Sequence, residues 1–232
     1  MPIIMLITAF AALVSMGSAP RASVLMGRGD NEEAHYTLGN SFIMLIIIAL
    51  ILTVFFRRFA EPLLMAFGAS ENTIGYAMDY MRIYTLGTIF VQFALGLNAF
   101  ITAQGFAKIS MATVVIGAII NIVLDPIFIF GFHMGVKGAA LATIISQAVS
   151  AIWVLRFLTG KKTILKLQKK YFRLRGSVVG PCLLLGMSPF IMQATESAIS
   201  VCFNSSLYRY GSDIAVGAMS ILTSIMQFAM LP

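Results

Sequence analysis

The chain has 232 residues, of which 59% are hydrophobic and 11% are charged, and its mean hydropathy is +0.92. Soluble domains are about 45–50% apolar and about 25% charged, so the composition excludes a soluble protein and predicts an all-α, polytopic membrane helix bundle. The net charge is +7, but the basic residues gather in one connector, and we expect no nucleic-acid partner.

Taken in chain order, the sequence contains about seven apolar stretches close to the length of about 20 residues that a membrane-spanning helix needs. Only the fourth and the sixth contain an acidic residue. The stretches are residues 2–19, 38–56, 83–103, 109–132, 138–155, 178–203 and 214–232.

The connector after the fifth stretch, residues 156–175, carries eight lysines and arginines and no acid. The positive-inside rule predicts that this connector faces the cytoplasm. Alternation of the spans then puts the start of the chain on the outer side. We therefore expect a further helix upstream, and we interpret the sequence as part of a longer protein.

The fourth stretch contains a carboxylate, Asp125, in otherwise apolar surroundings. A charge at the bilayer centre costs roughly 2.5–3.5 kcal/mol on insertion scales, and such residues usually face the bundle interior or a water-filled cavity. Asn121 lies four residues earlier, on the same helix face, and Pro126 lacks the N–H that would bond the carbonyl of Ile122. The pattern predicts an oxygen-rich site for a proton or a sodium ion. The alternative is a local kink with Asp125 hydrated near the outer interface.

Other polar residues inside the predicted spans have two interpretations each. Thr143 lies in a stretch of small residues that lets helices approach closely, so it either faces the ion site or only packs. The amide of Asn98 is typical of a bond between helices. Glu196 either relays protons or balances a cationic substrate, or it is a structural partner of a nearby polar side chain.

The sequence contains neither HExxH nor GxSxG, so it predicts no protease or hydrolase geometry. Its two cysteines, Cys182 and Cys202, have no metal-binding spacing. We therefore expect no enzymatic activity and no bound cofactor, and no metal beyond a sodium ion at Asp125. A purely structural scaffold fits poorly, because two carboxylates lie inside the spans.

Four strings resemble the multidrug and toxic compound extrusion (MATE) transporters, most closely the bacterial multidrug export branch. They are PRASVLMGRGD (20–30), GLNAFITAQG (96–105), NIVLDPIFIF (121–130) and GVKGAALATIISQ (135–147). The resemblance implies twelve helices in two six-helix lobes, of which this chain matches the second to eighth. Residues 1–158 would then be the N-terminal lobe without its first helix. Residues 159–177 would be the basic cytoplasmic inter-lobe loop, and residues 178–232 the truncated start of the C-terminal lobe.

The resemblance also implies a secondary antiporter in the cell membrane of a bacterium. It would export cationic drugs or toxic organic compounds in exchange for protons or sodium, by alternating access. Its partners would be small organic cations and membrane lipids, and it would be a monomer. The alternative is a flippase for a lipid-linked precursor from the same superfamily, although such flippases line their cavity with basic residues that these spans almost lack. Glu196 resembles an acid that some members carry on their seventh helix.

Within the family, the coupling ion is held by an Asn and an Asp four residues apart on the fifth helix and a Thr on the sixth. These positions match Asn121, Asp125 and Thr143 here. Tyr80 and Asn98 match other polar members of the same network. The Asp of the family's first helix has no counterpart in this chain, because that helix is absent.

Overall fold

The computed structural model describes residues 2–67, 69 and 71–229, and every element within them is helical. In chain order the elements are α1 (Pro2–Gly27), α2 (Asn31–Arg58), α3 (Ala60–Ala66), α4 (Ile74–Leu86), α5 (Thr88–Gly96), α6 (Asn98–Ala103), α7 (Ala107–Pro126), the π-helical turn η1 (Ile127–Gly131), α8 (Val136–Thr159), the 3-10 turn η2 (Lys169–Tyr171) and α9 (Gly176–Ala229).

Among the described residues, five helices are long and apolar enough to cross a membrane, and one bent pair makes a sixth span. The bent pair joins α4 to the segment 88–103 at an angle of 58°. It begins at Ile74, nine residues before the predicted start, because Asp79 and Arg82 hide this part of the helix from a hydropathy reading. The predicted stretch 214–232 falls on the last part of α9 and on residues 230–232, which lie outside the described residues.

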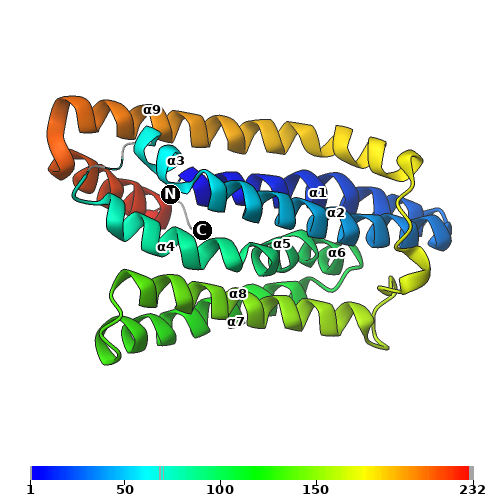
Figure 1. The fold of residues 1–232 in the computed structure, drawn as a ribbon. Coiled ribbons are helices and arrows are strands. Elements are labelled where there is room, and N and C mark those ends of the chain that lie inside the picture. Colours follow the sequence, from blue (N-terminus) through cyan, green and yellow to red (C-terminus); the bar gives the residue numbers. More distant parts are fainter. Residues whose placement is uncertain (1, 68, 70, 230–232) are drawn as a thin grey trace.

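The helices lie roughly parallel in a flattened bundle (Figure 1). Helix α9 runs along α1 and α2, helices α7 and α8 lie on the opposite side, and α4 to α6 lie between them. The closest approach is between α1 and α9. A Cβ added at Gly17 would collide with the backbone of Cys182, and one added at Gly186 would collide with the backbone of Leu13. Such contacts between small residues are how membrane helices pack closely.

The main apolar core lies at the predicted cytoplasmic half of the bundle, where α2, α5, α6 and α8 meet. Its fully buried members include Leu45, Leu97, Phe100 and Leu158. Leu165 belongs to the same cluster although it lies in the connector after α8, and its side chain is 0% exposed. The connector therefore contributes to the core.

The connector, residues 160–175, is a strap fixed across one end of the bundle (Figure 1). Its first half is held by Gln104, which follows α6 and is buried. The Gln104 side-chain oxygen accepts hydrogen bonds from the Thr163 hydroxyl (2.7 Å) and from the amides of Ile164 and Leu165 (2.8 Å each).

The second half of the strap is held by Asn40, a buried residue of α2. Its amide group donates to the carbonyl of Arg173 (3.2 Å), and its oxygen accepts from the amide of Arg175 (2.7 Å). The Arg175 guanidinium lies over the Tyr36 ring, 3.4 Å from the centroid, and 3.9 Å from Glu33. The segment predicted as an inter-lobe loop is thus part of the first bundle, and the division into two lobes stays a prediction.

Candidate functional site

The polar pair predicted on the fourth span lies on the inner face of α7. The Asn121 amide donates to the Asp125 carboxylate over 3.4 Å, and both side chains are half-buried. On the outer face, Ile122 is 70% exposed and Val123 is also exposed, as expected for side chains in contact with lipid. The four-residue spacing therefore placed both polar side chains correctly on one face.

Pro126 is the last residue of α7, but the helix does not stop there. It continues as the π-helical turn η1, whose Ile127 carbonyl accepts a bond from the amide of Phe132 (3.0 Å). A Cβ added at Gly138 of α8 would lie 2.8 Å from the carbonyl carbon and oxygen of Phe128. The expected kink is thus a π-helical turn pressed against α8, and π-turns of this kind are frequent at functional sites.

Two hydroxyls from neighbouring helices complete the group around Asp125. The Thr143 hydroxyl on α8 donates to the carbonyl of Ala139 (2.9 Å). Tyr80 on α4 is in side-chain hydrogen-bonding reach of Thr143 and close enough to Asp125 to feel its charge. The Tyr80 ring also stacks on Tyr84, with centroids 5.7 Å apart. Helices α4, α7 and α8 therefore converge on one polar group, which we call the Asp125 group (Tyr80, Asn121, Asp125 and Thr143).

An ion pair that the sequence analysis missed ties α4 to α8 beside this group. The Lys137 ammonium lies 3.3 Å from the Asp79 carboxylate, and the side chains are 53% and 37% exposed. An exposed pair of this kind contributes only about 0–1 kcal/mol. Asp79 was overlooked because it precedes the predicted start of its span, and it directly precedes Tyr80.

The structure separates two other predicted residues from the Asp125 group. The Asn98 amide donates to the carbonyl of Ser110 (3.3 Å) near the opposite end of α7. Fifteen residues of helix at about 1.5 Å each put Ser110 about 22 Å from Asp125. Glu196 is exposed on α9, which packs chiefly on α1, and its carboxylate has no hydrogen bond or ion pair within the described part of the chain. Its neighbour Ser197 donates to the carbonyl of Pro2 (3.0 Å).

The donors of the Asp125 group are one carboxylate, one amide and two hydroxyls. Oxygen-rich groups inside membrane bundles suit protons and sodium ions. Across the described residues there is no cluster of three His, Cys, Asp or Glu side chains that could hold a transition metal.

Comparison with known proteins identifies the family. Residues 1–127, more than half of the chain, match the family described as MatE. The chain belongs to the MatE family. A curated relative, the multidrug export protein MepA of Staphylococcus haemolyticus, is 30% identical over 98% of this chain and 50% of its own length. The chain thus spans about half the length of the curated relatives that it matches.

Solved structures of MatE-type transporters have the same fold. The MATE multidrug transporter DinF-BH, solved as a complex with a drug, is 37% identical, with a TM-score of 0.94 over 100% of this chain and 52% of that one. An inward-facing MATE family multidrug resistance transporter is 26% identical, with a TM-score of 0.95 over 100% of this chain and 53% of that one. These likenesses confirm the predicted family and the helical membrane fold, so this MatE chain is a multi-pass membrane protein.

Proposed function

We propose that the protein exports cationic drugs or toxic organic compounds in exchange for protons or sodium ions, by alternating access. Its curated relatives are multidrug export proteins, and one structural neighbour is a multidrug transporter in complex with a drug. Another neighbour was solved in an inward-facing conformation, which supports alternation between inward and outward states. These relatives are transporters, so the proposal includes no enzymatic step and no resident cofactor.

The observation that carries the coupling part of the proposal is the convergence of three helices on Asp125. A carboxylate that is half-buried in a membrane bundle is costly when it is charged and unpaired. A proton or a sodium ion removes that cost, and both need the same oxygens, so each excludes the other. Asn121, Thr143 and Tyr80 would orient the carboxylate and supply the remaining polar contacts.

The π-helical turn next to Asp125 gives the change of charge a route to α8. Pro126 leaves this part of the helix with fewer hydrogen bonds to break. The turn touches α8 through the backbone contact between Phe128 and Gly138. A shift of the turn on binding of an ion would therefore move α8 directly, with no flexible side chain between the two backbones.

The test is Asp125→Asn, which keeps the size of the side chain and removes its titration. The control is Glu196→Gln, which neutralises the other intramembrane acid. Export of a fluorescent organic cation is measured against external pH in cells expressing the gene that encodes this chain, at matched protein levels. We expect Asp125→Asn to lose gradient-driven export. If this variant keeps the rate and the pH profile of the parent, Asp125 is only a residue of the helix bend and the coupling proposal is wrong.

A binding measurement tests the same site without transport. Sodium that binds only the folded chain at 100 times its Kd raises the free energy of unfolding by about 2.7 kcal/mol. Thermal unfolding of the purified chain in sodium and in choline should differ for the parent and not for Asp125→Asn. Equal shifts in both proteins would mean that sodium binds elsewhere.

The flippase alternative has less support from this geometry. A lipid-linked precursor carries phosphate, which requires unpaired basic side chains in the transport path. Beside the Asp125 group, the basic residue Lys137 is already paired with Asp79.

A further inference from the structure

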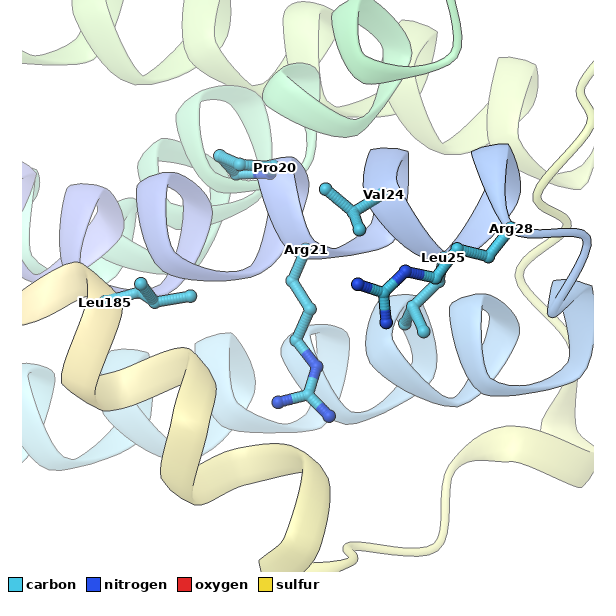
Figure 2. Close-up of a pocket in the computed structure, with 6 residues that line it drawn as sticks. All are labelled: Pro20, Arg21, Val24, Leu25, Arg28 and Leu185. Atoms are coloured by element: carbon cyan, nitrogen blue, oxygen red, sulfur yellow. The ribbon is translucent and has the colours of Figure 1, made fainter.

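A pocket of about 360 Å³ opens between α1 and α9, far from the Asp125 group (Figure 2). Its volume falls within the range of about 300–1,000 Å³ that is typical of ligand pockets. The lining residues are Pro20, Arg21, Val24, Leu25, Arg28 and Leu185. The pocket thus combines two cations with an otherwise apolar wall.

The two arginines act on one space. They are seven residues apart, two helical turns, and therefore lie on one face of α1. Figure 2 shows both guanidinium groups on the same side of α1, with the Arg28 side chain folded back along the helix towards Arg21. Among the described residues, neither arginine forms an ion pair. Two like charges without a counter-charge favour a bound anion.

The depth of the pocket matches the boundary between lipid headgroups and acyl chains. Helix α1 has 26 residues, about 39 Å at 1.5 Å per residue, against a hydrocarbon thickness of about 30 Å. Arg21 lies six residues before Gly27, about 9 Å from the end of the helix. This end is the predicted cytoplasmic one, because it precedes the turn that lies on the side of the strap (Figure 1).

The apolar wall of the pocket is open on the outside of the bundle. Val24 is 54% exposed and Leu185 is 58% exposed. A free inorganic anion would use the guanidinium groups and leave this apolar surface uncovered. A ligand with an anionic head and an acyl chain would cover both.

We propose that this pocket binds the headgroup phosphate of an anionic phospholipid of the cytoplasmic leaflet. Arg21 and Arg28 hold the phosphate, since the planar guanidinium forms paired hydrogen bonds with phosphate oxygens. The first part of the acyl chain lies on Val24 and Leu185. The site is independent of the proposed ion coupling, and its two positive charges repel a cationic substrate.

The bound lipid would fill a gap in the joint between α1 and α9. These helices touch closely at Gly17 and Gly186, and the pocket opens beside this crossing, where Leu185 is the neighbour of Gly186. A phospholipid held there adds contacts to both helices, so it should stabilise this joint against separation.

The test uses the 232-residue chain in detergent, titrated with phosphatidylglycerol or with phosphatidylcholine of the same acyl chains and followed by native mass spectrometry. The double variant Arg21→Gln/Arg28→Gln is compared with Arg57→Gln/Arg58→Gln, which removes the same charge from the end of α2. We expect the parent and the control to prefer phosphatidylglycerol. The pocket variant should bind it at least about tenfold more weakly, the loss of one charge-assisted hydrogen bond.

Two further arms separate a lipid from other occupants. Leu185→Gln should weaken phosphatidylglycerol binding, and inorganic phosphate should not displace the lipid. In membranes, a photo-reactive residue at Val24 should yield lipid adducts. Unchanged lipid preference in the arginine variant would overturn the proposal, as would displacement by inorganic phosphate. Adducts to polypeptide at Val24 would mean that an acidic protein segment fills the pocket instead.

Discussion

The hold of Gln104 on the strap can be tested by a single substitution, Gln104→Leu. The parent side-chain oxygen accepts bonds from the Thr163 hydroxyl and from the amides of Ile164 and Leu165. Leucine has similar volume and keeps the apolar contacts, but it accepts no hydrogen bond. The variant therefore removes the polar anchor and leaves the packing close to unchanged.

The size of the effect follows from what each freed group can do. The Thr163 hydroxyl already has a second acceptor, the carbonyl of Leu165 (2.9 Å), so its loss is small. The Ile164 amide is only partly buried and can bond to water. The Leu165 amide is buried and would be left unpaired, which costs about 1–3 kcal/mol, with about 1 kcal/mol more for the Ile164 bond. A total of about 2–4 kcal/mol raises the open population of the strap by about 30-fold or more.

Limited trypsin digestion measures that population, because cleavage follows the fraction of opened chain when closing is fast. Lys161 and Lys162 are exposed cleavage sites next to the anchor. We expect Gln104→Leu to be cut there at least about 30-fold faster than the parent. The control Gln147→Leu makes the same chemical change on α8, away from the strap, and should be cut at the parent rate. Equal cleavage of Gln104→Leu and the parent would refute the reasoning, because the strap would then be held by its apolar contacts alone.

Three further outcomes are expected. Gly138→Ala should lower thermal stability by about 1–3 kcal/mol, because the new Cβ meets the backbone of the π-helical turn, whereas Gly180→Ala, with nothing within 4 Å, should be neutral or stabilising by up to about 1 kcal/mol; gains of equal sign would contradict this contrast. A double-mutant cycle on Asp79 and Lys137 should give a coupling below about 1 kcal/mol, and a larger value would mean that the pair is shielded from solvent. A cysteine at Ser177, which is exposed, should resist an impermeant thiol reagent in intact cells and react after lysis; labelling without lysis would invert the predicted topology.

The sequence predicted what depends on short spacings. Asn121 and Asp125 are four residues apart on one helix, and their contact follows from helix geometry alone. The start of α4 was missed because Asp79 and Arg82 lower the hydropathy of a helix whose polar side chains face its neighbours or its end. Grouping Asn98 with the ion site was wrong in position, since its amide bonds α7 at the other end of the helix.

The strap could not be predicted, because its anchors are far apart in the sequence. Gln104 bonds to residues 59 to 61 positions later, and Asn40 bonds to residues 133 to 135 positions later. An amide in an apolar stretch indicates only that a polar partner exists. Which partner it is depends on the tertiary fold, and a run of basic residues such as 156–175 indicates a loop whether or not the loop is fixed.

The two attachments of α9 differ in chemistry, and this difference has a consequence for the proposed alternating access. At its start, α9 follows Arg175 directly, and Asn40 holds that residue by its backbone amide. Further along, α9 touches α1 mainly through glycine contacts, which rest on van der Waals packing and need no hydrogen bond to be broken. The polar bond from Ser197 to the carbonyl of Pro2 lies at the opposite end of α1 from the strap. If α9 moves relative to α1 during transport, separation costs least along the glycine contacts and most at the strap, so the movement is expected to pivot about Gly176.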